Sequence, residues 1–431
     1  MGKGESGMNR RMLSRVGAVV AAGIVLAGLS GGLMAQKINA NSPKPGEPRL
    51  MGQSPNPVVN SQFVDANTKF GFKLFSEILK QDNKKNVFVS PTSIAIALAM
   101  TYNGASASTQ QAMAKALELQ GMSLQDVNQA NNALKASLEN ADPDVQFSIA
   151  NSLWAKQGIP FKREFLQRNQ QFYGAKITEL DFTKPDAPTI INSWVKENTR
   201  NKIDQIVQQI DPADVLFLIN AIYFKGNWTH KFDNSQTAER PFYLPDGTQK
   251  QQPMMSQSGK YRYYENETFQ AVSLPYGKER LSLYVFLPRK NTSLDAFQQQ
   301  LAIDNWQQWM SQFKMRNGSI QLPRFKLEYD IQLNTALKSL GMEEAFDDSR
   351  ANFSNMTSAS VKIDEVKHKT FVEVNEEGTE AAAATSVRAT LTSARMPEAP
   401  FQMVVDRPFF CAIRDNQTGT VLFMGSIVEP K

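Results

Sequence analysis

Two histidines and one cysteine carry the most reactive side chains of this 431-residue sequence. His230 lies in the polar stretch NWTHKFDNS, and His368 lies in a strand-like run. The sequence contains no H-E-x-x-H, no G-x-S-x-G and no cluster of Cys and His, so a zinc site and a Ser-His-Asp triad are both unsupported. Cys411 lies in an apolar run, where a small buried hydrophobe is a better interpretation than a nucleophile. The sequence therefore predicts no metal site, no cofactor and no enzymatic activity.

The positive charge of the chain is concentrated near the N-terminus. The whole chain has a net charge of +5, and the first 40 residues contain five basic residues against one acid, Glu5, a balance of +4. The remainder is thus only about +1, which does not form the clustered basic face that nucleic-acid binding requires. No nucleic-acid partner is expected.

The first 40 residues have the organisation of a secretory signal. A basic region precedes the apolar stretch VGAVVAAGIVLAGLSGGLMA, with plausible cleavage after Ala35 or Ala40, and the arginine pair in NRRMLS is a weak indication of twin-arginine export. The apolar stretch is also long enough for an uncleaved membrane anchor. We expect residues 1–40 to be a signal peptide or signal anchor. The protein is accordingly expected to be secreted, extracellular or periplasmic, or else anchored in a membrane by this segment.

The rest of the chain reads as one linker and one large domain. Residues 41–60, NSPKPGEPRLMGQSPNPVVN, are rich in proline and polar side chains, which is typical of a flexible tether. Residues 61–431 contain no second linker of this kind and no internal repeat, so a single domain is expected there.

Helical spacing of apolar residues dominates the first half, and strand-like runs dominate the second. Ser90 and Pro91 form a helix-start signal, and further helices are expected at residues 109–119, 124–139 and 189–200. The continuous apolar runs LFLINAIYF and LSLYVFLP are typical of strands buried on both faces, and DNQTG is expected to turn a hairpin between two C-terminal strands. This order favours an α+β fold with a large, mainly antiparallel sheet.

The segment EEGTEAAAAT, residues 376–385, is unusual for a globular protein. It follows the strand-like run KTFVEVN and precedes a stretch with no clear period. Four consecutive alanines contribute little to a core and favour helix over strand.

Several separated motifs resemble those of the serpins, a family of serine-protease inhibitors, and the resemblance extends over nearly all of residues 61–430. The matching stretches are NVFVSPTSIAIALAM, INSWVKENTRNKI, LINAIYFKGNW, LPRFKLEYD, DRPFFCAIRDNQTGTVLFMG and, most specific, HKTFVEVNEEGTEAAAAT. The resemblance implies N-terminal helices packed on large sheets, with an exposed reactive loop near the C-terminus. It also implies a suicide-substrate mechanism, in which a protease cleaves the loop, forms an acyl-enzyme and is trapped when the loop inserts into the main sheet.

In this interpretation the alanine-rich segment is the hinge of the loop. The hinge comprises Glu376, Glu377, Gly378, Thr379, Glu380, Ala381, Ala382, Ala383, Ala384 and Thr385. As a strand, the segment would turn one face of small or apolar side chains inward, namely Thr379, Ala381, Ala383, Thr385, Val387 and Ala389. The opposite face would carry Glu380, Ala382, Ala384, Ser386, Arg388 and Thr390, and with them every charge of residues 379–390.

The resemblance also assigns two supporting groups of residues. A polar cluster beneath the strands that must separate would comprise Ser90, Ser93, Asn220 and His368. The region where insertion begins would comprise Trp228, Thr237 and Arg324, and Arg324 is expected to pair with Glu376. Ordinary structural packing is the alternative interpretation for each of these residues.

Two bonds compete as the reactive bond. The family's usual spacing from the hinge indicates Thr392–Ser393, which suits proteases with small apolar pockets, such as elastase-like or subtilisin-like enzymes. Side-chain chemistry alone favours the rival Arg395–Met396, a trypsin-like site. Pro408 lies further from Gly378 than in many serpins, so the choice stays open: Thr392–Ser393 is preferred and Arg395–Met396 is the rival, whereas a cut after Arg388 would leave a shorter strand to insert.

Two other functions compete with the inhibitor. A non-inhibitory serpin, such as a carrier or chaperone, is the first alternative, although such members commonly lose the small-residue hinge. A secreted hydrolase is the second, and the isolated histidines argue against it. Residues 121–145 contain a single lysine against four acids, so no polyanion site is expected. The protein is expected to act as a monomer.

Overall fold

The strands of the described residues form two sheets, and the smaller one carries the candidate site. The computed structural model describes residues 59–431 except 83, 140 and 379–398. These residues belong to one compact unit, Pro55–Lys431. The expected leader, residues 1–40, and residues 41–58 of the expected linker lie outside the described residues.

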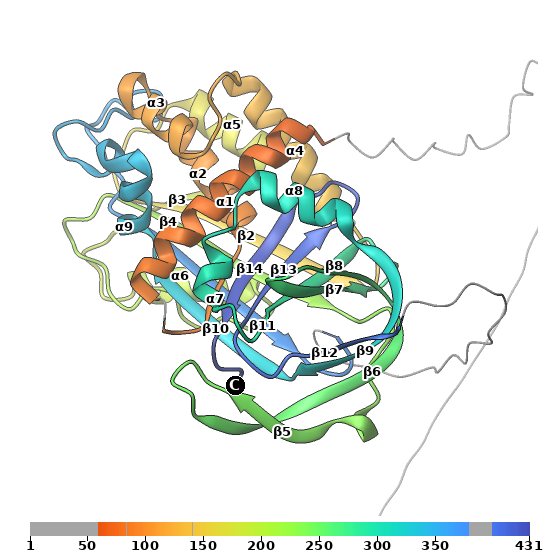
Figure 1. Cartoon of the computed structure of the whole chain (residues 1–431). Coiled ribbons are helices and arrows are strands. Elements are labelled where there is room, and N and C mark those ends of the chain that lie inside the picture. The colour runs from red at the N-terminus through yellow and green to blue at the C-terminus, as the bar shows by residue number, and fades with distance from the viewer. Residues whose placement is uncertain (1–58, 83, 140, 379–398) are drawn as a thin grey trace, which may run out of the picture. The chain divides into compact units, whose positions relative to one another are not determined.

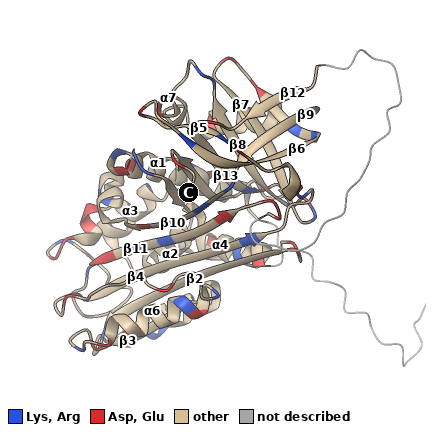
Figure 2. Ribbon diagram, turned by 90° about the horizontal axis from the view of Figure 1, so that it is seen from below, with Lys and Arg blue, Asp and Glu red and all other residues tan. Residues whose placement is uncertain are grey.

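The smaller sheet has five strands in the order β10-β11-β4-β2-β3. Figure 2 shows β10, β11, β4 and β2 side by side, with α6 lying over the sheet. The central pair, β11 and β4, runs parallel, whereas β10 pairs with β11 and β2 pairs with β4 in antiparallel fashion. We call the β11–β4 contact the seam. The bounds of the strands are β2 Val145–Lys156, β3 Lys176–Leu180, β4 Leu216–Gly226, β10 Phe325–Gln332 and β11 Glu365–Val374.

Strand β4 is buried on both of its faces, as its apolar run predicted. Phe217, Ile219 and Ala221 face a core that α6 (Ala187–Asn198) covers, whereas Leu218 and Ile222 face the larger core on the other side. Asn220 lies on the second face by alternation, so a polar side chain enters the larger core at the seam.

The larger sheet follows the order β1-β14-β13-β8-β7-β6-β9-β12, with β5 added on β6 (Figure 1). All its pairs are antiparallel except β12 with β9. The expected hairpin around DNQTG joins β13 to β14. The bounds are β1 Val87–Val89, β5 Ala238–Tyr243, β6 Gln249–Glu265, β7 Phe269–Tyr276, β8 Leu281–Pro288, β9 Lys314–Pro323, β12 Phe401–Val404, β13 Phe409–Asp415 and β14 Val421–Ile427.

Helix α2 (Pro91–Tyr102) is buried along its whole length between the two sheets. Ser90 caps it, because its side chain accepts a hydrogen bond from the Ser93 amide at 3.3 Å, and Pro91 occupies the first turn as predicted. Burial of each large aliphatic side chain, such as Ile94 or Leu98, contributes about 2 kcal/mol. The helix therefore fixes Ser90 and Ser93 beneath the seam.

The other helices confirm the expected α+β arrangement. Their bounds are α1 Ser61–Asp82, α3 Ala107–Ala116, α4 Leu124–Glu139, α5 Arg163–Tyr173, α7 Leu294–Gln298, α8 Ile303–Gln312 and α9 Asn334–Leu337. Helix α4 has the bounds that its apolar spacing predicted. The helices predicted at residues 109–119 and 189–200 exist as α3 and α6, each beginning two residues earlier.

Candidate functional site

A tight turn closes one end of the seam. Beyond β11, the Asn375 amide donates to the Gly378 carbonyl at 2.9 Å, and the Gly378 amide donates to the Asn375 carbonyl at 3.2 Å. Gly378 also forms an antiparallel bridge with Asn227, which follows β4. The turn thus reverses the chain at the point where β11 and β4 end together.

Glycine is required at position 378 for two reasons. Its φ of 133° is a conformation that other residues rarely adopt. In addition, a Cβ atom there would lie 2.2 Å from the carbonyl oxygen of Gly226 and 2.6 Å from the Asn227 Cα. The turn therefore packs directly against the backbone at the end of β4.

Trp228 holds this turn from the side. Its backbone amide donates to the Glu377 carbonyl at 3.0 Å, and its indole Nε1 donates to the Asn375 carbonyl at 2.8 Å. The indole stacks on the ring of Tyr276, with centroids 4.4 Å apart. Since the side chain is buried, these hydrogen bonds are shielded from water and contribute more than exposed ones would.

Glu376 is the buried charge of the turn. Thr237 Oγ1 donates to its carboxylate at 2.6 Å, and the Arg324 guanidinium forms an ion pair with the same carboxylate. Burial opposes ionisation, but the hydrogen bonds from Arg324 and Thr237 outweigh it and hold the pKa of Glu376 below its usual range. The expected pair of Arg324 with Glu376 is confirmed, and Trp228, Thr237 and Arg324 all meet at this turn.

The polar cluster lies further along the same seam, where His368 on β11 stands opposite Asn220 on β4. His368 Nε2 accepts from the Ser90 amide at 3.1 Å, and Nδ1 lies 2.5 Å from the Asn220 side-chain oxygen. Because Nε2 accepts, we assign the ring proton to Nδ1. The Asn220 amide in turn donates to the Ser93 hydroxyl and to the side chain of Asn151 on β2. The four expected residues are therefore in contact, and Asn151 is a fifth member that sequence reasoning missed.

Burial determines the charge state of His368. The side chain is fully buried, and this desolvation lowers the pKa of His368 to about 3. The imidazole is therefore neutral at physiological pH and acts as one donor and one acceptor. The cluster links α2, β2, β4 and β11 across the seam, so the seam cannot open there without breaking its hydrogen bonds.

The remaining predicted site residues lie outside the described residues. These are hinge residues Thr379, Glu380, Ala381, Ala382, Ala383, Ala384 and Thr385, the bond Thr392–Ser393 and the rival bond Arg395–Met396. The chain is described again from residue 399, where the Arg316 guanidinium donates to the Ala399 carbonyl at 3.3 Å. Phe401 on β12 then stacks on Tyr263 with centroids 3.8 Å apart.

No group of three or more potential metal ligands lies together in the part of the chain that the structure describes. His230 is exposed, and Cys411 is fully buried, which raises the pKa of its thiol and disfavours the reactive thiolate. The distinctive feature of the described residues is instead the closed seam. A tight turn closes it at one end, and a polar cluster closes it along its length.

Comparison with known proteins identifies relatives of this chain. A family sequence model described as "Serpin (serine protease inhibitor)" matches residues 65–430. The human leukocyte elastase inhibitor is 36% identical over 382 residues, which cover 86% of this chain and 100% of that protein. The native structure of the thermophilic serpin tengpin matches with a TM-score of 0.79 at 33% identity, covering 86% of this chain and 95% of that one. Thyroxine-binding globulin in complex with thyroxine matches with a TM-score of 0.78 at 25% identity, covering 86% and 100%.

The prediction of a secreted, extracellular, periplasmic or membrane-anchored protein is contradicted by these relatives. The leukocyte elastase inhibitor is an intracellular protein without a signal peptide. The alignment covers the whole of that relative but only 86% of this chain, and the family match begins at residue 65. The relative therefore has no counterpart of the leader. Among the described residues, no helix has the length and apolar character needed to cross a bilayer.

Proposed function

The chain belongs to the serpin family of serine protease inhibitors, which are not enzymes, and from this premise we propose that it is a suicide-substrate inhibitor of serine proteases. A target protease cleaves the loop that follows Gly378 and forms an acyl-enzyme. The cleaved loop then inserts between β11 and β4 and carries the protease with it, before the ester hydrolyses.

The observation that carries this proposal is the parallel seam. Neighbouring strands β11 and β4 run in the same direction, and the turn at Asn375–Gly378 reverses the chain at their shared end. A strand that continued from this turn back along the seam would run antiparallel to both neighbours. Antiparallel pairing is slightly more stable per residue than the parallel pairing it would replace. The seam therefore has the topology that loop insertion requires.

The residues of the loop support the same conclusion. The face that would turn inward carries Thr379, Ala381, Ala383, Thr385, Val387 and Ala389, none of which is large or charged. About a dozen residues gaining backbone hydrogen bonds, at about 1 kcal/mol each, would contribute on the order of 10 kcal/mol. The entropy of ordering the strand offsets part of this, so release of strain from the intact state supplies the rest.

The proposed target is a protease with a small apolar specificity pocket, elastase-like or subtilisin-like, cleaving Thr392–Ser393. The name of the leukocyte elastase inhibitor supports an elastase-like target. Cleavage of Arg395–Met396 by a trypsin-like enzyme is the rival. The inhibitor would act as a monomer, one chain for each protease. A non-inhibitory carrier is the second candidate, because thyroxine-binding globulin, solved with bound thyroxine, is 25% identical to this chain.

The test is incubation of the protein with elastase, subtilisin and trypsin separately, followed by denaturing gels and mass spectrometry of the cleavage site. We expect a gel-stable complex with elastase or subtilisin and a cut after Thr392. A matched control uses each protease with its active serine already blocked, which cannot form an ester and should give no complex.

Each outcome discriminates between the candidates. A complex with trypsin alone, cut after Arg395, keeps the mechanism and changes the target. Clean cleavage of the loop with no complex, and no gain in thermal stability afterwards, overturns the inhibitor and favours the carrier.

A further inference from the structure

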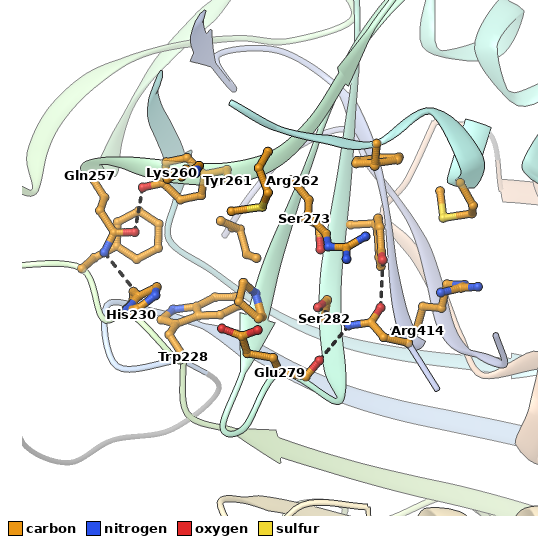
Figure 3. A pocket seen from close by; sticks show the side chains of 18 residues that line it. Trp228, His230, Gln257, Lys260, Tyr261, Arg262, Ser273, Glu279, Ser282 and Arg414 are labelled. Carbon is orange, nitrogen blue, oxygen red and sulfur yellow. Dashed lines mark hydrogen bonds between the residues drawn. The ribbon is translucent and has the colours of Figure 1, made fainter. Parts of the chain in front are cut away.

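A pocket of about 300 Å³ lies beside the turn, with Trp228 in its lining. It is lined by side chains from β6, β7, β8, β9, β13 and α8 together with the segment that follows β4. Figure 3 shows Trp228 and His230 at one end of the lining, Arg414 at the other, and Arg262 with Ser273 between them. Its volume lies at the lower end of small-molecule sites, which suits a compound of one or two rings.

The lining carries more positive than negative charge. It contains three cations, Lys260, Arg262 and Arg414, and a single acid, Glu279. Among the described residues, none of these three cations forms an ion pair or a side-chain hydrogen bond. A guanidinium donor without a protein acceptor is a ready partner for an anion. The pocket is therefore suited to negative charge.

The walls of the pocket are aromatic. Five rings contribute to the lining, those of Trp228, Phe232, Tyr261, Tyr284 and Phe313. Aromatic faces stack on flat apolar ligands and are worth about 1 kcal/mol for each well-placed pair beyond their buried area. We propose that this pocket binds a small aromatic anion, a carboxylate or sulfonate on a one- or two-ring system, and that its occupancy slows loop insertion.

Hydrogen bonds connect the pocket to the turn. Tyr261 Oη donates to Gln257, whose side-chain amide donates to the carbonyls of His230 at 3.2 Å and Lys231 at 2.6 Å. Lys231 then pairs with Glu377 of the turn at 2.6 Å. Figure 3 shows Tyr261, Gln257 and His230 joined in this order. Gln257, which is itself part of the lining, therefore connects the pocket to the turn.

This connection indicates that an occupied pocket slows loop insertion. That effect rests on the proposed function. Trp228 lines the pocket and also donates to both Glu377 and Asn375. An occupant that packs on the indole stabilises the arrangement in which the turn is held closed. Insertion then competes less well with hydrolysis of the acyl-enzyme, and more inhibitor is consumed as substrate.

The first experiment measures binding alone, by calorimetric titration of the full chain with naphthalene-2-sulfonate. The neutral naphthalene-2-sulfonamide is the control ligand. Arg262→Gln is the test variant, and Arg240→Gln, an exposed arginine on β5 outside the pocket, is its matched control. We expect saturable binding of the sulfonate, weakened about tenfold or more by Arg262→Gln and by loss of the ligand's charge. Absence of binding, or equal weakening by both variants, overturns the site.

The second experiment measures the effect on inhibition. Elastase is titrated with the protein in the presence and absence of saturating naphthalene-2-sulfonate, and complexed and cleaved chains are separated on denaturing gels. We expect the ratio of complex to cleaved chain to fall about fivefold with ligand. Lys231→Met, which removes the ion pair with Glu377 at a residue outside the lining, should retain binding but reduce this fall. Binding without any change in the ratio overturns the coupling, whereas a protein that forms no complex even without ligand refutes the proposed function and leaves the binding result standing.

Discussion

At the scale of single residues, the two histidines of the chain occupy opposite environments. His230 is exposed, whereas His368 is fully buried at the seam and uses both ring nitrogens in hydrogen bonds. Protonation of His368 would remove the acceptor that the Ser90 amide requires and would place a charge in an apolar core. The neutral ring is thus a requirement of the closed seam.

This difference predicts a pH dependence of stability. Between about pH 3 and 6.5, the unfolded chain binds a proton at His368 that the folded protein, with its pKa lowered to about 3, does not. Stability therefore rises with pH across this window, by up to about 1.4 kcal/mol per pH unit from this group. The measurement is urea unfolding of the wild type and of His368→Gln at several pH values from 5 to 7. We expect the difference between their unfolding free energies to shrink as the pH falls.

His230→Gln provides the matched control, since it replaces an exposed histidine that takes no part in the polar cluster, and it should leave the pH profile of the wild type unchanged. If instead His368→Gln follows the same profile as the wild type, His368 takes up its proton alike in the folded and unfolded protein, and the neutral buried ring assigned here is wrong.

At the scale of elements, the turn after β11 fixes where the seam ends. Gly378→Ala should destabilise the protein, because alanine is strained at a φ of 133° and its Cβ would meet the Gly226 carbonyl. We expect a loss larger than the ~1–3 kcal/mol that the backbone conformation alone accounts for, because the contact of the Cβ with the Gly226 carbonyl adds to it. Chemical unfolding monitored by circular dichroism measures it.

Gly247→Ala separates the two causes of this loss. Gly247 has a φ of 83° in the turn between β5 and β6, but a Cβ there would meet no atom within 4 Å. Its replacement should therefore incur only the conformational part. Equal losses for the two variants would mean that Gly378 does not pack closely against the end of β4.

Elements with strong local patterns could be predicted from the sequence. The bounds of α4 and the buried strands β4 and β8 follow from apolar spacing, which depends on neighbouring residues alone. Helix α5 was missed, because REFLQRNQQFY is largely polar and buries only Phe165, Asn169 and Tyr173. The parallel seam was not predicted from the residue pattern either, since it joins strands far apart in the sequence.

The candidate site, like the fold, was predicted from the sequence only in part. The pair of Arg324 with Glu376 and the contacts among Ser90, Ser93, Asn220 and His368 came from a resemblance to whole motifs. Asn151 joins the cluster only because the register of β2 places it opposite Asn220. No local signal around Asn151 indicates that register, so the sequence alone offered no means of finding it.

At the scale of the whole molecule, the two ends of the reactive loop are attached to different sheets. The N-terminal end leaves the five-stranded sheet at Gly378, and the C-terminal end joins the nine-stranded sheet at β12, where Arg316 contacts Ala399 and Phe401 stacks on Tyr263. An intact loop is therefore anchored on both sides. In the proposed mechanism, cleavage would release the N-terminal portion to enter the seam while β12 stays paired with β9.

The last prediction tests whether insertion proceeds from the hinge. Thr379→Pro places a residue without a backbone N–H, and with a fixed φ, at the first inserted position. The target should still cleave this variant at the wild-type bond but leave no gel-stable complex. The wild type should gain on the order of 10–20 °C in thermal midpoint after cleavage, and the variant should gain little. Thr379→Ala, which keeps the amide and a small side chain, should behave as the wild type. If Thr379→Pro forms the complex and gains the same stability, the strand does not enter the seam from Gly378, and the mechanism proposed for this chain is wrong.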